Sequence, residues 1–281
     1  MIAAVYALVF ALAQVSAPAT TEQPLEINTA LMQSTFLLQG PSKVAPGKFS
    51  VGSGFVVGQP CGGAAPDRGA YTLVTAAHVL DEIAGEDLLI LVRLKQPDGT
   101  WRPVKHFVKI REIDRDRWAK HPEADVAALY ITLPDGAAPQ LLPIGFFATD
   151  SILERFAGHP GDEVLALGFP FGVTANEPGF PLLRSGRIAS YPLLPQAQTK
   201  TFMVDMDAFP GNSGSPVYFY DRNRFYEGGM HIGEVRFLMG IITGTVSAGD
   251  PEHTRLRIAE VVHANFVLDT IAKLPPPPCG R

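Results

Sequence analysis

One serine in this sequence stands in a setting that favours chemistry. The stretch FPGNSGSPV, residues 209–217, places Ser213 between an asparagine and a glycine, with a second glycine, Gly211, two residues earlier. Glycines on both sides let the backbone adopt conformations that other residues avoid. A serine hydroxyl is a weak nucleophile, so it needs a base within hydrogen-bond reach and a third group that orients the base. If Ser213 is a nucleophile and not a turn residue, the chain must also supply a histidine and an acid.

Two further residues have the types and the settings that this chemistry needs. In TLVTAAHVLDE, His78 follows an apolar stretch, at a turn of small residues that begins a helical stretch. In HPEADVAALYIT, Asp125 opens another apolar stretch, where a carboxylate is costly to bury unless it accepts hydrogen bonds. Each signal alone is more typical of a structural histidine, a capping aspartate or a turn serine than of a catalytic residue. Together, the order His78, Asp125, Ser213 is typical of a catalytic triad built between two halves of a chain.

Most of the chain is predicted to form short β-strands. Runs of Val, Ile, Leu and Phe alternate with turns, and the sequence has 27 glycines and 25 prolines, a pattern typical of β-structure. The first set of predicted strands covers residues 35–38, 50–57, 71–75, 88–94, 104–110 and 126–131. The second set covers residues 163–167, 184–191, 201–205, 216–220, 237–246 and 256–262. Two sets of six predict an all-β fold of two six-stranded antiparallel β-barrels.

Further segments complete the expected organisation. Ala264–Lys273 is predicted to form a short C-terminal helix, because its apolar face ends at LPPPPCGR. Residues 221–235, DRNRFYEGGMHIGEV, are polar and are predicted to form a surface loop. The predicted divisions are a signal peptide at 1–19, an N-terminal barrel with His78 and Asp125 at 20–140, a C-terminal barrel with Ser213 and the terminal helix at 141–273, and a Pro-rich tail at 274–281.

The composition excludes several classes of protein. With 46% hydrophobic and 18% charged residues, the chain can bury a full core. A net charge of -5, a pI near 5.8 and the lack of a Lys/Arg cluster argue against nucleic acid as a partner. No histidine lies near Cys61 or Cys279 in a metal-ligand spacing, so we expect neither a metal nor an organic cofactor.

The first residues predict export. Residues 2–13 are apolar and are followed by small residues that suit a signal-peptidase site, although no Lys or Arg precedes them. We therefore expect a secreted or periplasmic protein with no stable membrane insertion after signal removal, and an uncleaved anchor is the alternative. In an exported chain Cys61 and Cys279 could form a disulfide, and two unpaired thiols are the other possibility. The sequence leaves the oligomeric state open.

Six motifs resemble those of the trypsin-like (chymotrypsin-fold) serine peptidases, especially the bacterial type without an activation peptide. They occur in the family's order and span nearly the whole chain after the predicted signal. They are GSGFVV at 52–57, TAAH at 75–78, ADVAAL at 124–129, LGFPFG at 167–172, GNSGSPV at 211–217 and GIITG at 240–244. The resemblance implies a serine endopeptidase that hydrolyses polypeptides through an acyl-enzyme.

The resemblance also implies a role for the residues that could do chemistry. Ser213 would attack the scissile carbonyl, and His78 would take and return its proton. Asp125 would fix the tautomer of His78 and stabilise its cation. The backbone N–H groups of Gly211 and Ser213 would bind the oxyanion of the tetrahedral intermediate.

Substrate contacts are implied by the same resemblance. Thr243 would hydrogen-bond the catalytic aspartate, and Gly244 and Thr245 would line the edge where the substrate backbone pairs as an extra strand. Asp207, six residues before the nucleophile, resembles the floor of the specificity pocket in relatives that cleave after Arg or Lys. Its carboxylate would pair with a basic side chain of the substrate. The alternative is a structural hydrogen bond made by Asp207 or Asp205.

The sequence departs from the family pattern at three points. Ser215 occupies a position that is glycine in most relatives, no IVGG-like activation sequence follows the predicted signal, and there is no room for a PDZ domain after the helix.

Two other functions compete with a serine endopeptidase. One is that of a catalytically silent homologue that binds peptide in the same cleft. The other is that of an esterase, but GNSGS lacks the glycine two residues after the serine, and no alternating strand-helix pattern surrounds it.

Overall fold

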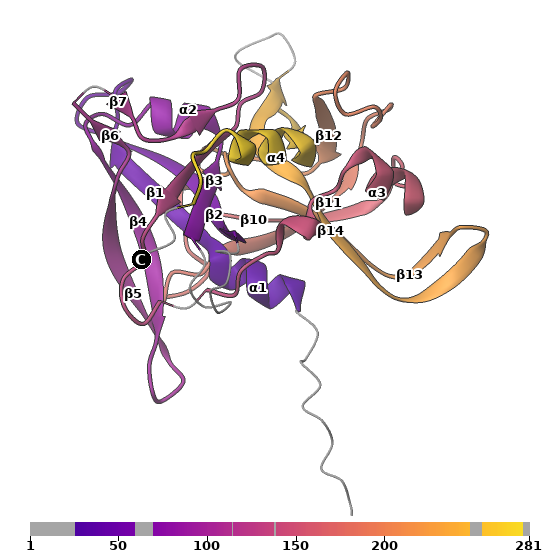
Figure 1. Ribbon diagram of the computed structural model, residues 1–281, viewed down its shortest axis with the longest axis horizontal. Coiled ribbons are helices and arrows are strands. Elements are labelled where there is room, and N and C mark those ends of the chain that lie inside the picture. Colours follow the sequence, from indigo (N-terminus) through magenta and orange to yellow (C-terminus); the bar gives the residue numbers. More distant parts are fainter. Residues whose placement is uncertain (1–25, 60–69, 114, 138, 248–254, 278–281) are drawn as a thin grey trace, which may run out of the picture.

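Two antiparallel β units lie side by side in the computed structural model, which describes residues 26–59, 70–113, 115–137, 139–247 and 255–277 (Figure 1). Helix α4 (Ala264–Ala272) follows the last strand and contacts strands of both units. The predicted signal peptide and both cysteines lie outside the described residues.

The N-terminal unit is a seven-stranded sheet with the strand order β5-β4-β1-β2-β3-β9-β8. Its strands are β1 (Thr35–Pro41), β2 (Phe49–Gln59), β3 (Ala70–Thr75), β4 (Asp87–Lys95), β5 (Trp101–Lys109), β8 (Ala119–Lys120) and β9 (Ala127–Ile131). A separate two-stranded sheet is formed by β6 (Arg111–Glu112) and β7 (Arg115–Asp116). Successive residues of a strand point to opposite faces, and the buried apolar residues of β4 are Leu88, Ile90 and Val92, which share one face.

This unit differs in detail from the predicted six-stranded barrel, because no pairing between described residues joins its edge strands β5 and β8. β8 has two residues, too few for periodicity to reveal. β5 carries Pro103 and the exposed Lys105 and Lys109, which are features that keep an edge strand from pairing further. The prediction of a mostly β, chymotrypsin-like fold is confirmed, whereas closure of the first barrel is not observed in the described part of the chain.

The C-terminal unit is the closed six-stranded barrel that the sequence predicts. Its strands follow the order β10-β11-β12-β15-β14-β13, which returns to β10. Their bounds are β10 (Glu163–Gly168), β11 (Leu182–Ile188), β12 (Thr201–Asp205), β13 (Pro216–Tyr226), β14 (Gly229–Ser247) and β15 (Arg255–His263). β14 pairs with β13 from Gly229 to Ile241 and with β15 from Gly240 to Ser247, so only Gly240 and Ile241 have a strand partner on both sides.

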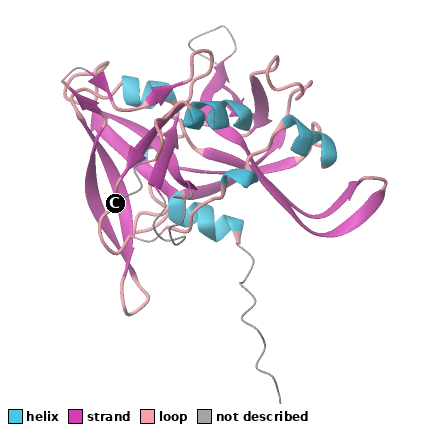
Figure 2. Ribbon diagram, viewed as in Figure 1, coloured by secondary structure: helices cyan, strands magenta, loops and turns pink. Residues whose placement is uncertain are grey.

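The prediction of a surface loop at residues 221–235 is wrong. These residues belong to the hairpin of β13 and β14, which projects from the barrel (Figure 2). Phe225 pairs with Met230 across the strands, and the rings of Tyr226 and His231 stack with their centroids 3.8 Å apart. Such cross-strand pairs stabilise the hairpin. Its many polar residues interrupt the alternation of apolar and polar residues by which a strand is recognised in a sequence.

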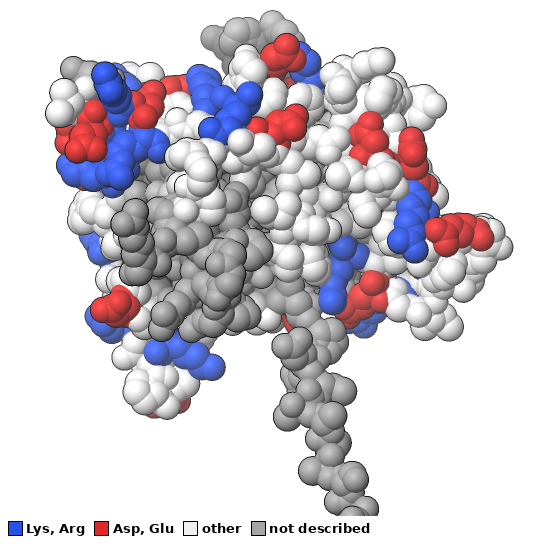
Figure 3. Space-filling model, in the orientation of Figure 1, with Lys and Arg blue, Asp and Glu red and all other residues white. Residues whose placement is uncertain are grey.

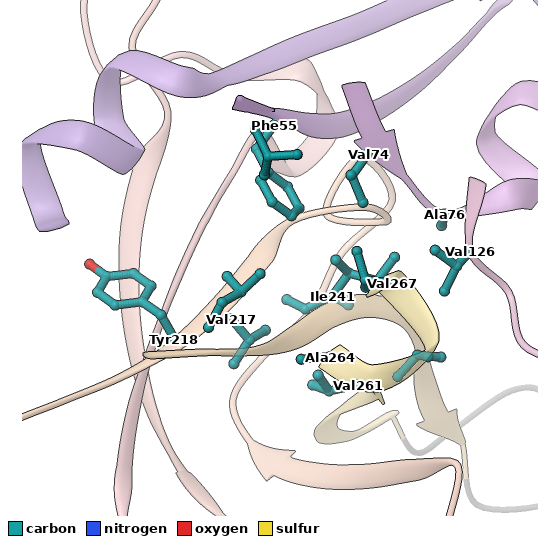
Figure 4. Packing of buried hydrophobic residues seen from close by; sticks show 14 of the residues in the cluster. Phe55, Val74, Ala76, Val126, Val217, Tyr218, Ile241, Val261, Ala264 and Val267 are labelled. Carbon is teal, nitrogen blue, oxygen red and sulfur yellow. The ribbon is translucent and has the colours of Figure 1, made fainter. Parts of the chain in front are cut away.

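The helices are short and lie around one continuous core. They are α1 (Ile27–Ser34), α2 (Ala77–Asp81), α3 (Asp150–Arg155) and α4, with 3-10 turns η2 (Ile144–Phe146) and η3 (Pro170–Gly172). The predicted C-terminal helix is confirmed as α4. In the core, Phe55 and Val74 of the N-terminal unit approach Val217 and Ile241 of the barrel and Val267 of α4 (Figure 4). No helix in the described ranges is both long enough and apolar enough to cross a membrane.

Candidate active site

His78 and Asp125 lie together because β3 and β9 are paired. That ladder ends at the pair Thr75 and Ala127, so α2, which follows β3, and the bend before β9 start from the same end of the sheet. His78 Nδ1 lies 2.5 Å from Asp125 Oδ2, and the backbone N–H of His78 donates to Asp125 Oδ1 at 2.9 Å. Because an ionised carboxylate only accepts, Nδ1 carries the hydrogen and Nε2 is left as the basic nitrogen.

The surroundings of the pair raise the pKa of His78 and lower the pKa of Asp125. The His78 and Asp125 side chains are 36% and 34% exposed. Burial lowers the pKa of His78, but the hydrogen bond and charge of Asp125, aided by Glu82 and Asp81, raise it overall above its ordinary value. Burial raises the pKa of Asp125, but the hydrogen bonds and charge of His78 lower it overall. Asp125 therefore stays ionised near neutral pH, and His78 is a stronger base than a free imidazole.

The loop that carries Ser213 needs both of its glycines. Gly211 and Gly214 have φ angles of 97° and 85°, in the left-handed region that glycine favours. A Cβ on Gly214 would lie 2.0 Å from the Ser53 carbonyl oxygen, and a Cβ on Gly211 would lie 2.3 Å from the Phe169 carbonyl oxygen. The glycines therefore permit both the bend of the loop and its close contact with neighbouring backbone.

Ser53 connects this loop to the N-terminal unit. Its backbone N–H donates to the Ser213 carbonyl at 2.8 Å, and its hydroxyl donates to the Gly211 carbonyl at 2.7 Å. The Ser53 carbonyl in turn accepts from the Thr75 hydroxyl at 2.7 Å. Because Thr75 ends β3, three residues before His78, these bonds hold the serine loop next to the histidine. In the sequence Ser53 stands out only as part of the motif GSGFVV, which does not predict this role.

The peptide group between Pro210 and Gly211 is held in one orientation. The Phe171 N–H donates to the Pro210 carbonyl at 2.6 Å, and in a trans peptide the C=O and N–H point in opposite directions. The Gly211 N–H therefore points away from Phe171. Neither this N–H nor that of Ser213 donates a hydrogen bond to any described residue, so both remain available to a developing oxyanion.

The loop that carries Ser213 lies against the segment that leads to His78, and no hydrogen bond joins the two side chains. A Cβ on Gly214 would lie 3.0 Å from the backbone nitrogen of Ala76, two residues before His78. Within the described ranges, no hydrogen bond joins the half-buried Ser213 hydroxyl to His78, whose ring bonds Asp125 through Nδ1. Contacts of this kind are often long without substrate and tighten in the complex. The fold thus brings the three residues into one region with the histidine already oriented.

A pocket opens beside Ser213. Its volume is about 200 Å³, and its lining residues are all uncharged: Ala208, Phe209, Pro210, Ser213, Ile242, Gly244 and Thr245. Two of the residues predicted to contact substrate, Gly244 and Thr245, therefore border the same space as the serine. Phe209 is flanked by the ring of Phe171, with centroids 5.2 Å apart, and by the guanidinium of Arg184, 5.2 Å from the ring centroid.

Asp207 does not line this pocket. Its carboxylate lies 3.9 Å from Arg184 Nη2 and 3.5 Å from Arg257 Nε. Two basic side chains of the same chain therefore already face the carboxylate that was expected to receive a basic side chain of the substrate. The arrangement agrees with a structural role for Asp207, the alternative that the sequence left open.

The contacts of Thr243 and Ser215, two other residues that the family pattern singles out, differ from what the sequence predicts. Thr243 makes no hydrogen bond to Asp125 in the part of the chain that the structure describes, and the carboxylate accepts from the two N–H groups of His78. Ser215 is fully buried, and its hydroxyl oxygen would lie 2.0 Å from a Cβ on Gly168. The hydroxyl thus occupies space that the glycine leaves free and stays outside the pocket.

Charged side chains outside the site lie mostly in pairs. On the face shown in Figure 3, basic and acidic side chains lie beside one another, and Lys120 pairs with Asp81 at 2.7 Å. In the described ranges, no group of three or more His, Cys, Asp or Glu side chains could hold a metal ion.

Comparison with known proteins places the site in a family. Residues 52–225 match the family model of the trypsin-like peptidase domain, and this range contains His78, Asp125 and Ser213. None of the curated proteins compared matches the sequence significantly.

Solved structures of three proteases are similar to this chain at low identity. The HtrA-type protease AlgW with tripeptide is 19% identical with a TM-score of 0.49, and the match covers 88% of this chain and 62% of AlgW. The protease Anisep from Arthrobacter nicotinovorans is 13% identical with a TM-score of 0.46, covering 85% of this chain and 94% of Anisep. The Rv3671c protease from M. tuberculosis, in its active form, is 20% identical with a TM-score of 0.49, covering 98% and 96%. The chain therefore spans less than two thirds of AlgW.

Proposed function

The chain belongs to the trypsin-like peptidases, since the family model matches residues 52–225, and we propose that it cleaves polypeptides with Ser213, His78 and Asp125 as its catalytic triad. Membership of the family supports activity as a serine endopeptidase. The observation that carries the assignment of the triad is the 2.5 Å contact between His78 Nδ1 and Asp125 Oδ2. The Ser213 loop, which is bent at two glycines, lies against the segment that leads to His78.

In the proposed mechanism, Ser213 Oγ attacks the carbonyl carbon of the scissile bond while His78 Nε2 takes the hydroxyl proton. The carbonyl oxygen becomes an oxyanion that accepts hydrogen bonds from the N–H groups of Gly211 and Ser213. The imidazolium, stabilised by Asp125, then gives its proton to the leaving amine as the C–N bond breaks. Water, deprotonated by His78, hydrolyses the resulting acyl-enzyme and restores the serine.

The substrate backbone is proposed to pair with β14. The Gly214 N–H donates to the Ile242 carbonyl, and the Ile242 N–H donates to the Ser215 carbonyl. From Thr243 onward, described residues supply β14 with only β15 as a strand partner. An extended peptide can therefore add a strand at Thr243, Gly244 and Thr245, with its scissile carbonyl next to Ser213.

Cleavage after Arg or Lys was the expectation from Asp207, and the pocket supports a different preference. An uncharged lining would leave a basic side chain without a counter-charge, because Asp207 faces Arg184 and Arg257. A cavity of about 150 Å³ can bind benzene, so a pocket of about 200 Å³ has room for a branched aliphatic side chain. We therefore propose that the residue before the cut is apolar.

Hydrolysis of a casein-type substrate tests the assignment. The variant Ser213→Ala should lose activity on the order of 10⁶-fold, the loss typical of triad hydrolases, while its melting temperature stays within a few degrees. Ser185→Ala, which changes an exposed serine of β11, is the matched control and should retain full activity. Hydrolysis by Ser213→Ala at the wild-type rate would reject Ser213 as the nucleophile, and an inactive wild-type protein that still binds peptides would favour the silent homologue.

Export is a separate proposal. Residues 1–19 lie outside the described residues, and the apolar run followed by small residues supports cleavage of a signal peptide and a secreted or periplasmic location. The mass of the protein recovered from its natural location tests this: loss of about the first 19 residues is expected, and a full-length chain held in the membrane would favour the uncleaved anchor.

A further inference from the structure

Glu260 lies beside the edge of β14 that is proposed to bind the substrate backbone, and its carboxylate has no ion-pair or hydrogen-bond partner among the described residues. It stands on β15 directly opposite Gly244 of β14. Its Oε2 lies 3.3 Å from the position that a Cβ on Gly244 would occupy. Gly244 borders the pocket together with Ser213, so a carboxylate is held close to the path of a bound peptide. The missing side chain at Gly244 leaves this carboxylate within reach of that path.

Glu260 faces away from the interior of the barrel. Its neighbours Ala259 and Val261 are fully buried at 0% exposure, and successive residues of a strand point to opposite faces. Glu260 therefore lies half-buried on the outer face of β15. Ile242, which pairs with Val261, lines the pocket from the inner face. A register shift between Ile242 and Gly244 places Gly244 on the outer face with Glu260.

On the outer face around Glu260, the side chains of Glu260 and Asp205 form no ion pair with a described residue, although Arg187 of β11 is the cross-strand partner of Asp205. Within the described ranges, the carboxylate of Glu260 forms no ion pair or hydrogen bond. Met203 of β12 is its cross-strand partner, and Asp205, two residues further along, is exposed on the same face and also lacks a described partner. Lys200, just before β12, has its ammonium 3.0 Å from Glu123 and is already paired. A cation that arrives with a substrate would meet a free carboxylate here.

We propose that Glu260 makes this peptidase prefer substrates with Lys or Arg at the second or fourth residue before the cut. The inference rests on the proposed function, because it takes Ser213 as the nucleophile and the adjacent pocket as the site of the residue before the cut. Alternate side chains of an extended peptide point to opposite faces. When the first residue before the cut enters the pocket, the second and fourth point to the outer face, where a long basic side chain reaches Glu260. Recognition of a basic residue thus moves from Asp207 to Glu260.

Matched peptides test this preference. Quenched fluorescent peptides would differ only in Lys, Gln or Glu at the second or the fourth residue before the cut. For one of these positions, kcat/KM should be about fivefold higher with Lys than with Gln, which corresponds to an ion pair of ~1 kcal/mol, and the ratio should fall at high salt. Glu260→Gln should abolish the ratio and leave kcat/KM for the Gln peptide unchanged. Glu163→Gln, an exposed acid on β10, is the control and should keep the ratio.

Binding to the Ser213→Ala protein separates this inference from the proposed function. Isothermal titration should show that the Lys peptide binds about fivefold more tightly than the Gln peptide, and that Glu260→Gln in the same background removes the difference. Charge-selective binding without hydrolysis by the wild-type protein would reject the proposed function and would still support recognition of the basic side chain by Glu260. Equal binding and equal hydrolysis of the two peptides, or a preference that Glu260→Gln retains, would overturn the inference and leave the function intact.

Discussion

The buried His263 should make the protein sensitive to acid. This residue is 0% exposed, its ring lies against Phe202 with centroids 4.7 Å apart, and neither ring nitrogen has a hydrogen-bond partner within the described ranges. Burial lowers the pKa of His263 from 6.5 to about 4. The folded protein therefore keeps the imidazole neutral at pH values where the unfolded chain protonates it.

The magnitude follows from this difference in pKa. Between pH 6.5 and pH 4 the unfolded state binds the extra proton, so the free energy of unfolding falls as the pH falls, by ~1.4 kcal/mol per pH unit where the effect is full. A shift from 6.5 to about 4 gives a total loss of about 3 kcal/mol from this one residue. Above pH 6.5 the contribution to the pH dependence vanishes, because both states are then neutral.

Urea unfolding of His263→Phe and of the wild-type protein at half-unit steps from pH 7.5 to pH 4 measures the effect. Any change in packing shifts the stability of the variant by a similar amount at each pH, so the diagnostic quantity is the difference in slope. The variant should gain about 3 kcal/mol relative to wild type between pH 7 and pH 4. Ser185→Ala, which changes an exposed side chain that does not titrate, is the control and should leave the slope unchanged. Parallel curves for wild type and His263→Phe would refute the reasoning.

Three further predictions concern the site and its support. Gly211→Ala should lower kcat by about 100-fold with a smaller change in KM, because the new Cβ would meet the Phe169 carbonyl oxygen at 2.3 Å and move the oxyanion N–H; unchanged steady-state kinetics would contradict this. Asp125→Asn should lower kcat by about 10⁴-fold and move the acid limb of the kcat/KM profile to lower pH, since Asp125 raises the pKa of His78; an unshifted limb would reject the coupling. Arg93→Met should lower the free energy of unfolding by about 3 kcal/mol, because the buried guanidinium donates to four backbone carbonyls; denaturant unfolding with no change in midpoint would show that these bonds contribute nothing.

The parts of the proposed site that depend on residue type could be predicted from the sequence. Ser213, His78 and Asp125 stand in short stretches whose composition and neighbours are informative alone, and the pairing of β3 with β9 brings the last two together as expected. The glycines beside Ser213 predicted a bent loop, and both have positive φ. These features are local, so they can be read from a few residues.

Features that depend on distant partners could not be predicted in this way. Ser53 bonds the Gly211 carbonyl across 158 positions in the sequence, and nothing near Ser53 indicates that contact. Asp207 has the expected spacing from the serine, but Arg184 and Arg257, which face it, come from β11 and β15. The spacing of a carboxylate says nothing of the cations that surround it, so the role of Asp207 needed the fold.

The most direct test of the triad is covalent labelling by a fluorophosphonate, followed by intact mass measurement and peptide mapping. The reagent reacts with a serine only when a base and an oxyanion site activate it. One adduct on Ser213, lost in His78→Ala, is the result that the account predicts. An adduct on another residue, or no adduct under conditions that label a known serine peptidase, would contradict it.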